Sequence, residues 1–382
     1  MNSTLEAALV LGRPVDGDGT SWSRQLSAAD PAKAIGALRG GFALAVPLKD
    51  GTTVLGVDRF ARETICYAES DQGVRFSARA DELAGPSPEL DPQAIYDYLF
   101  FHAIPSPRTI FKGVHRLPPA TLALARGGKV DTRRYWTPHF APSAGGANFD
   151  VLAKEFMGLL ETAVRDQLDA GVPGCFLSGG TDSSTVAGMI ARTAGKVSTF
   201  SIGFEAEGYD EMQYARIAAK HFGADHHAYY VTPDDLVRSI AQVAASFDQP
   251  FGNSSVVPAY FCAKMAREAG VTRLLAGDGG DELFGGNSRY AKQKIFDAYA
   301  RLPGPLRTGL LEPVFGGRDD SGIALLRKAA SYIGQARLPM PERTHLYNLL
   351  LRLGVDEVLE PGFQALIDRT APGRQQRAVW DE

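Results

Sequence analysis

The stretch Gly174-Cys175-Phe176-Leu177-Ser178-Gly179-Gly180-Thr181-Asp182-Ser183-Ser184 decides the fold. Residues 174–177 form a short apolar run that predicts a buried strand, and residues 185–193 have the spacing of a helix. Between them, two glycines allow backbone N–H groups to turn inward and approach a phosphate closely. The positive end of the following helix points to the same place. Residues 178–184, which we call the Ser178 loop, therefore predict a pyrophosphate cradle.

Two further features of the Ser178 loop bear on its ligand. Asp182 is a poor phosphate contact by itself, but it fits beside Mg²⁺, which takes oxygen ligands and bridges phosphate charge. The loop is not a Walker A motif, because no Gly-Lys-Ser/Thr follows at the required spacing. The alternative is a plain strand-to-helix turn in which an Asp or Ser caps the helix.

Strands and helices alternate on both sides of this loop. Such alternation predicts parallel βαβ units, whose right-handed crossovers bring the carboxyl ends of the strands to one edge. Ligands of open α/β sheets bind at that edge. The predicted strands are 196–204, 226–231 and 272–276, and the predicted helices are 149–170, 211–222, 233–246 and 256–269.

A second glycine-rich loop follows the strand predicted at 272–276. Its sequence is Ala276-Gly277-Asp278-Gly279-Gly280-Asp281-Glu282-Leu283-Phe284-Gly285-Gly286, and we call it the acidic loop. The clustered carboxylates of Asp278, Asp281 and Glu282 repel one another unless cations neutralise them. One or two Mg²⁺ ions would do so, and the alternative is a solvated acidic loop.

The amino-terminal part has a different pattern. Asp-Gly, Gln-Gly and Gly-Gly turns separate β-prone runs and predict hairpins over 42–57, 65–78 and 121–135, with a helix at 91–101 between the last two. Residues 138–148 are small and rich in Pro and Gly, which is typical of a linker. We therefore predict a sheet-rich domain at 1–137, a linker at 138–148 and an α/β domain at 149–382 that becomes helical and less regular from about residue 290.

Composition excludes several classes of protein. The 382 residues carry 40 Lys and Arg against 44 Asp and Glu, a formal net charge of −4, so no positive footprint for nucleic acid is expected. The longest apolar runs, near 42–46 and 256–262, are too short to span a bilayer. No signal peptide is evident, so a cytoplasmic location is the default. Each of the three cysteines (Cys66, Cys175 and Cys262) is interpreted as a small buried hydrophobe rather than a nucleophile or ligand.

The Ser178 loop and the acidic loop together resemble the synthetase domain of glutamine-dependent asparagine synthetases, a broad family that includes β-lactam synthetases and lasso-peptide macrolactam cyclases. The resemblance covers most of residues 30–300. Upstream it includes segments similar to the second half of the family's glutaminase domain. The further matching segments are 38–43, 58–60, 76–78, 107–111, 117–119, 199–204, 209–211, 226–227, 247–250 and 258–260.

The resemblance implies a fold and a set of site residues. The fold is α/β: a β-rich remnant of an Ntn-type glutaminase domain, followed by a parallel-sheet ATP-pyrophosphatase domain with a helical carboxyl-terminal part. Asp182 and Asp281 would hold Mg²⁺, and Asp278 would lie near the acyl group, with Glu282 completing the catalytic set. ATP would be bound by Leu177, Ser178, Gly179, Gly180, Asp182, Ser183 and Ser184, with Ile202, Ala276 and Gly277 at the adenine and ribose.

Two departures from the family pattern change the expected activity. Family glutaminase domains begin with a catalytic cysteine just after the initiator Met, where this chain has Asn2. We therefore expect no glutamine hydrolysis, and glutamate release from glutamine by the pure protein would refute this. The family also continues further, through a helix with a lysine that touches the pyrophosphate. The chain is then a fragment, half of a split enzyme completed by a partner chain, or a reduced form; Lys292 and Lys294 are substitutes for that lysine or plain surface residues.

The reaction implied is attack of a carboxylate on the α-phosphorus of ATP, followed by attack of an amine on the acyl-adenylate. Aspartate and ammonia are the default substrates by family frequency, and amidation or macrolactam formation on a sugar, peptide or metabolite carboxylate is the alternative. Residues 252–255 contain no Arg or Lys to bind a second carboxylate. Also open are a catalytically incomplete ATP-binding subunit and a tRNA-thiolating or GMP-forming relative. A homodimer is a further assembly candidate.

Overall fold

The computed structural model describes residues 8–14, 22, 25–26, 30–140, 148–168, 171–205, 210–315 and 324–380. Within these ranges no helix combines the length and the apolar character needed to cross a membrane. Most of the linker predicted at 138–148 lies outside the described residues. The chain divides into two compact units, residues 1–277 and 278–382, which are taken in turn.

A parallel sheet forms the centre of the α/β part, as the alternation of strands and helices predicts. Its order is β11-β10-β9-β12, and all neighbouring strands are parallel. β12 contains only two ladder residues where five were expected, since its partner β9 is itself short. The strands are β9 (Gly174–Phe176), β10 (Ser198–Gly203), β11 (Asp225–Tyr230) and β12 (Leu274–Leu275).

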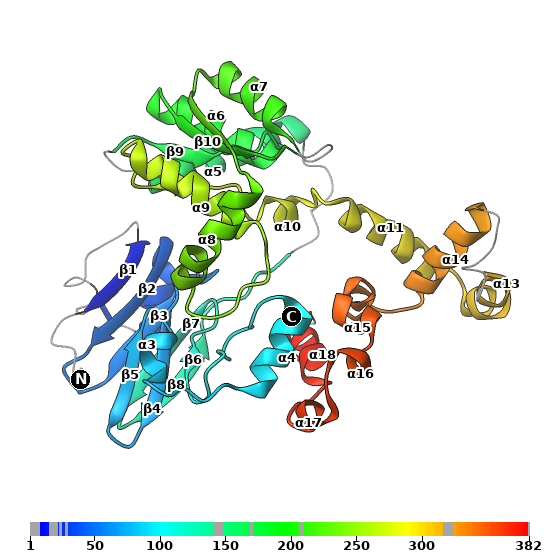
Figure 1. The fold of residues 1–382 in the computed structure, drawn as a ribbon, viewed down its shortest axis with the longest axis horizontal. Helices are drawn as coiled ribbons and strands as arrows, with labels where there is room; N and C mark the ends of the chain where they lie inside the picture. The colour runs from blue at the N-terminus through cyan, green and yellow to red at the C-terminus, as the bar shows by residue number, and fades with distance from the viewer. Residues whose placement is uncertain are drawn as a thin grey trace. The chain divides into compact units, whose positions relative to one another are not determined.

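Helices cover both faces of this sheet, so its central strands β9 and β10 are largely buried, as is usual for parallel sheets. Cys175, Leu177 and Val197 pack on one face with residues of α6 and α7. Phe200 packs on the other face with Cys262 and neighbouring residues of α9. Figure 1 shows these elements around β9 and β10. The helices are α5 (Phe149–Gln167), α6 (Thr181–Ala194), α7 (Met212–Phe222), α8 (Pro233–Ser246) and α9 (Val256–Glu268).

The amino-terminal part contains two antiparallel sheets, in the orders β1-β2-β3-β7-β8 and β5-β4-β6. All three predicted hairpins form: β2 pairs with β3, β4 with β5, and β7 with β8. β1 and β6 were not expected from the sequence. The strands are β1 (Leu9–Pro14), β2 (Gly40–Pro47), β3 (Thr53–Val57), β4 (Cys66–Ser70), β5 (Gly73–Ser77), β6 (His115–Arg116), β7 (Thr121–Arg126) and β8 (Lys129–Arg134).

These two sheets are stacked between short helices. Alternate residues of β2 point to opposite sides: Phe42 and Leu44 pack with Ile35 of α2 (Pro31–Ala37), while Ala43 and Ala45 face the second sheet. Beyond the second sheet, α3 (Asp81–Ala84) covers Cys66. The helix predicted at 91–101 is α4 (Pro92–Phe101), which begins after the capping side chain of Asp91. The β-rich domain predicted at the amino terminus is thus a layered α-β-β-α arrangement.

A half-buried histidine in the parallel sheet is expected to make the stability of this fold depend on pH. Nδ1 of His226 on β11 lies 2.9 Å from Thr199 Oγ1, and its Nε2 is buried without a hydrogen-bond partner. Burial lowers the pKa of His226 below its ordinary value of 6.5, and Arg216 and His227 act in the same direction. Protonation therefore favours the unfolded chain.

We expect the free energy of unfolding to be unaffected by His226 above about pH 6.5 and to fall as the pH drops below that value. Urea denaturation between pH 7.5 and 5.5 measures this fall, and His226→Asn should flatten it. His221→Asn, a change at an exposed position in the last turn of α7, is the control. If the free energy of unfolding of His226→Asn falls with pH as steeply as that of the wild type, His226 is not the cause of the pH dependence.

The second unit is helical, as predicted for the region beyond residue 290. Arg343 is buried, donates from Nη1 to Gln293 Oε1 at 2.8 Å and lies 4.8 Å from the ring centre of Phe296. The elements are α10 (Gly280–Phe284), α11 (Ser288–Ala300), α12 (Gly304–Leu306), η1 (Arg307–Leu311), α13 (Glu312–Phe315), α14 (Ala324–Ala336), η2 (Glu342–Tyr347), α15 (Leu349–Leu353), α16 (Val355–Val358), α17 (Pro361–Gln364) and α18 (Ala371–Trp380).

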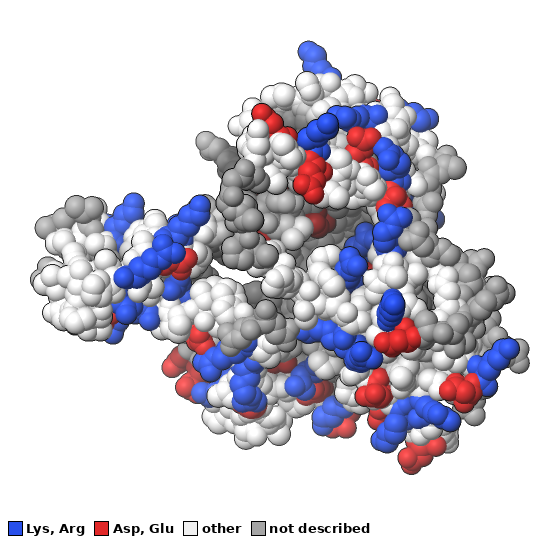
Figure 2. All heavy atoms as spheres, turned by 180° about the vertical axis from the view of Figure 1, so that it is seen from behind, with Lys and Arg blue, Asp and Glu red and all other residues white. Residues whose placement is uncertain are grey.

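Surface charge is mixed in sign. Over the described residues of the face that Figure 2 shows, Lys and Arg are interspersed with Asp and Glu rather than gathered into one basic field. A nucleic-acid partner requires such a field. The view agrees with the near balance of charges in the sequence.

Candidate functional site

The Ser178 loop begins where β9 ends, at the carboxyl edge of the parallel sheet. Leu177 is buried, and its N–H donates to Phe200 O of β10 at 2.9 Å. The next residues turn through a small hydroxyl network. Ser178 N donates to Ser183 Oγ at 3.1 Å, the two serine hydroxyls are 3.0 Å apart, and Gly180 N donates to Ser178 Oγ at 3.2 Å. These bonds hold the loop in a tight curve with Ser178 exposed.

Gly179 is required by both backbone conformation and space. Its φ of +87° lies in the left-handed region, which side chains disfavour. A Cβ at this position would lie 2.5 Å from Ala215 N and 2.6 Å from Tyr214 Cβ, both in the first turns of α7. The loop is therefore packed directly against α7, and no larger residue fits.

The structure corrects one expectation about this loop. The helix expected from residue 185 begins at Thr181, because Ser184 N already donates to Gly180 O at 3.1 Å. Asp182, Ser183 and Ser184 thus lie in the first turn of α6 rather than in a loop. The N-cap residue is Gly180, and no side chain makes a capping hydrogen bond to this helix. The alternative in which an Asp or Ser caps the helix is therefore wrong. An uncapped helix start presents N–H donors and the positive end of the dipole.

The start of the acidic loop lies against the Ser178 loop. β12 and β9 are neighbouring parallel strands. The residues that follow them therefore emerge next to each other at the same edge of the sheet. A Cβ on Gly277 would lie 2.9 Å from Asp182 Cβ and 3.1 Å from Ser183 N. Ala276 and Gly277 are therefore brought to the helix start, as the parallel-sheet prediction required. Ile202, the predicted adenine contact, is half-buried near the end of β10, on the sheet face that packs against α9.

The rest of the acidic loop belongs to the second unit. α10 lies between two glycines with positive φ, Gly279 and Gly285. A Cβ on Gly286 would lie 2.2 Å from Asp281 Oδ1, the end of an exposed side chain that can turn away. Asp278, Asp281 and Glu282 are all exposed. In the described part of the chain no three His, Cys, Asp or Glu side chains converge as a preformed metal site; Mg²⁺ bound mainly by phosphate and water needs only one or two carboxylates.

The three cysteines are buried, whereas Lys292 and Lys294 lie at the surface. Burial raises the pKa of Cys175 and of Cys262 to about 12, so both thiols stay protonated at neutral pH. Cys66 is also fully buried. Lys292 and Lys294 are exposed on α11. The interpretation of the cysteines as small hydrophobes is confirmed.

A set of bonds between the amino-terminal domain and the segment after α8 could not be predicted from the sequence. We call residues 246–252 the bridging segment. Arg79 donates to Ser246 O and Phe247 O, both at 3.1 Å. Ile110 N donates to Gln249 Oε1 at 3.2 Å, and Gly252 N donates to His102 O at 2.8 Å.

Asp248 is the centre of these bonds. Its Oδ2 accepts from Ala80 N at 2.7 Å and from Arg116 Nη2 at 2.6 Å. The side chains of Arg116 and Asp248 are only 19% and 13% exposed. Although 247–250 resembles a family segment, its partners lie more than a hundred residues away, beyond the reach of local patterns.

We expect Asp248→Ala to lower the free energy of unfolding by about 2–4 kcal/mol, because it leaves Arg116 and Ala80 N buried without their acceptor. Urea denaturation measures the change. The control is Asp234→Ala, which removes an exposed i,i+4 pair with Arg238 and should cost less than about 1 kcal/mol. Equal losses of unfolding free energy in the two variants would show that the buried Arg116–Asp248 pair stabilises the fold no more than an exposed pair does.

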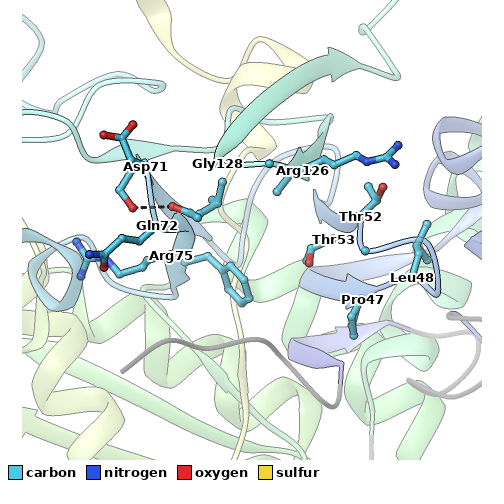
Figure 3. Close-up of a pocket in the computed structure, with 16 residues that line it drawn as sticks. Pro47, Leu48, Thr52, Thr53, Asp71, Gln72, Arg75, Arg126 and Gly128 are labelled. Atoms are coloured by element: carbon cyan, nitrogen blue, oxygen red, sulfur yellow. Dashed lines mark hydrogen bonds between the residues drawn. The ribbon is translucent and has the colours of Figure 1, made fainter.

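A separate cavity of about 960 Å³ lies in the amino-terminal domain, among the hairpin turns near residues 48–53, 70–76 and 125–128 (Figure 3). Ser70 Oγ donates to Gly73 O at 2.8 Å at its rim. None of the three cysteines lines this cavity. It therefore offers no thiol nucleophile to a bound ligand.

Comparison with known proteins agrees with this geometry. The asparagine synthase family model matches residues 155–359, and a glutamine amidotransferase domain model matches residues 28–136. Asparagine synthetase 1 (glutamine-hydrolysing) of Bacillus subtilis is 30% identical over 279 residues, covering 72% of this chain and 44% of the relative. A Mycobacterium tuberculosis protein provisionally named a glutamine-hydrolysing asparagine synthetase is 32% identical over 309 residues, covering 78% and 46%.

The chain thus spans about half the length of these curated relatives. The family match includes the Ser178 loop, the acidic loop and the sheet that joins them, which are the features on which the sequence resemblance rests. The chain belongs to the asparagine synthase family.

Proposed function

We propose that this chain is a carbon–nitrogen ligase that activates a carboxylate with ATP, releases pyrophosphate and passes the acyl-adenylate to an amine. The observation that carries the proposal is the uncapped start of α6, with Gly277, which follows the neighbouring strand β12, packed against Asp182. This arrangement favours a bound triphosphate, because N–H donors and hydroxyls meet at the carboxyl edge of the sheet. The family membership supports the same chemistry.

In this proposal the chain's residues act mainly by positioning and by electrostatic stabilisation. The backbone N–H groups of the Ser178 loop and the hydroxyls of Ser178, Ser183 and Ser184 hold the departing pyrophosphate. Asp182 and Asp281 are the proposed Mg²⁺ ligands, and the bound ion neutralises charge on the phosphates. Asp278 is proposed to lie near the acyl group, and Glu282 completes the proposed catalytic set. Ile202, Ala276 and Gly277 are proposed to hold the adenine and ribose, and Leu177 to contribute to ATP binding.

Aspartate and ammonia are the reference substrates, because the curated relatives are named asparagine synthetases. A second candidate is a carboxylate of a sugar, peptide or metabolite. It is favoured by the absence of Arg and Lys from 252–255, at the start of α9. The buried, protonated cysteines and the use of ATP fit a cytoplasmic enzyme.

The proposal is tested by assaying AMP and pyrophosphate on the full chain with ATP, Mg²⁺, ammonium and a panel of carboxylates. We expect AMP and pyrophosphate in equal amounts that depend on the carboxylate. ADP and phosphate would indicate attack at the γ-phosphorus and refute the adenylate. ATP binding without any product would favour a catalytically incomplete subunit, and activity restored by a second chain would identify the partner.

A further inference from the structure

A cavity between the amino-terminal domain and the α/β domain adjoins the bridging segment. Its volume is about 730 Å³, which is in the range of small-molecule sites. From the amino-terminal domain it is lined by Leu90, Ile110 and Phe111 among others; the opposite wall includes Phe247, Phe251 and Val257.

The wall formed by the bridging segment is fixed in place. Backbone and side-chain bonds from Arg79, Ala80, Ile110 and Arg116 hold it at intervals along its length. The rings of Phe247 and Phe251 stack at 5.3 Å with their planes 4° apart. These rings are 39% and 46% exposed, so a large apolar surface remains uncovered in a preformed hollow.

The charges at the cavity are already neutralised. Asp81 and Asp248 are the charged residues that line it, and they pair with Arg79 at 2.7 Å and Arg116 at 2.6 Å. Its lining within the described ranges contains no Lys, Arg or His. A second carboxylate placed here would lose water without gaining a cation, and an ammonium group would meet only carboxylates that already pair with Arg79 and Arg116.

The wall of the cavity extends to the segment that leads into α9. Asn253 and Ser254 line it just before α9, a helix of 13 residues and therefore about 20 Å long. The end of α9 leads directly into the start of β12, so its beginning lies toward the carboxyl ends of the strands. Phe261 of α9, stacked on Tyr229 near the end of β11 at 5.6 Å, agrees with this direction.

We propose that this cavity binds the carboxylate substrate, and that this substrate has an uncharged aromatic or aliphatic body rather than the second carboxylate and ammonium of free aspartate. The inference rests on the proposed function. The apolar body lies between Ile110, Phe111 and Phe251, and the reacting carboxylate points past Asn253 and Ser254 to the strand edge. The amino-terminal domain thus serves the synthetase by supplying one wall of the substrate site.

The test is the binding of 3-phenylpropanoate and of L-aspartate to the full chain by titration calorimetry. Ala244→Trp places an indole at an exposed position that lines the cavity, whereas Ala245→Trp changes the neighbouring exposed position that does not. We expect 3-phenylpropanoate to bind the wild type and Ala245→Trp equally, and Ala244→Trp at least about tenfold more weakly. Phe251→Ala should also weaken the binding of 3-phenylpropanoate. This variant tests the inference if Ala244→Trp does not fold.

Tighter binding of L-aspartate than of 3-phenylpropanoate would overturn the inference, as would equal affinities in the two Trp variants. Preferential binding of 3-phenylpropylamine would also overturn it, because the cavity would then take the amine. Pyrophosphate release distinguishes this inference from the proposed function. If the binding pattern holds but no carboxylate gives pyrophosphate, the proposed reaction is wrong while the apolar preference of the cavity stands.

Discussion

Replacing Asp182 with Asn is expected to lower the rate of pyrophosphate formation about 10²–10³-fold and to raise the Mg²⁺ concentration needed for half-maximal rate. Asn has nearly the shape of Asp but lacks its charge. The Cβ that packs against Gly277 is unchanged, so the contact between the two loops is kept. The loss would therefore come from the missing charge at the helix start.

The effect on folding separates this role from a structural one. Asp182 lies in the first turn of α6, where a negative charge stabilises a helix by about 0.3–1 kcal/mol. We expect Asp182→Asn to lower the free energy of unfolding by no more than this. Asp234→Asn, in the first turn of α8 and outside the site, is the matched control and should lose similar stability with full activity. If Asp182→Asn keeps activity within tenfold of the wild type, Asp182 only stabilises the start of α6 and is not a Mg²⁺ ligand.

Local patterns predicted most of the elements that carry the site, because strands of the parallel sheet and hairpins of the amino-terminal domain are encoded by short-range alternation and turns. The start of α6 was misplaced for a physical reason. A Gly-Gly-Thr-Asp-Ser-Ser sequence has weak helix propensity, yet here the helix is stabilised by packing of Val186 and Ile190 on the sheet. Tertiary contact therefore extends the helix into the glycine-rich turn.

Elements defined by distant partners were missed. β6 has two residues and exists only because Cys66 of β4 pairs with Arg116. The same Arg116 binds Asp248, 132 residues further along the chain. The spacing of residue types along the chain does not reveal such distant pairs. The cavity beside the bridging segment therefore could not be predicted from the sequence either. The two glycine-rich segments at the strand edge could be predicted from the sequence, whereas the cavity beside the bridging segment required the fold.

The close packing of Gly179 against α7 predicts the largest loss of stability. Gly179→Ala, two residues before the start of α6, is compared with Gly195→Ala, at the C-cap of the same helix. Both glycines have positive φ, +87° and +74°, so both substitutions strain the backbone by about 1–2 kcal/mol. Only Gly179 lacks space: its Cβ would lie 2.5 Å from the backbone nitrogen of Ala215, whereas no atom lies within 4 Å at Gly195.

Because the obstructing atom belongs to the backbone of α7, no change of rotamer relieves the clash, and the loop or the helix must move. We expect Gly195→Ala to cost about 1 kcal/mol and Gly179→Ala more than about 3 kcal/mol in urea denaturation. ATP affinity, measured by calorimetry on the folded fraction, should fall more than about tenfold in Gly179→Ala alone, since the Ser178 loop is displaced. Equal losses of stability in the two variants would mean that α7 moves aside at little cost in free energy. The Ser178 loop would then not be held rigidly, contrary to the proposed pyrophosphate cradle.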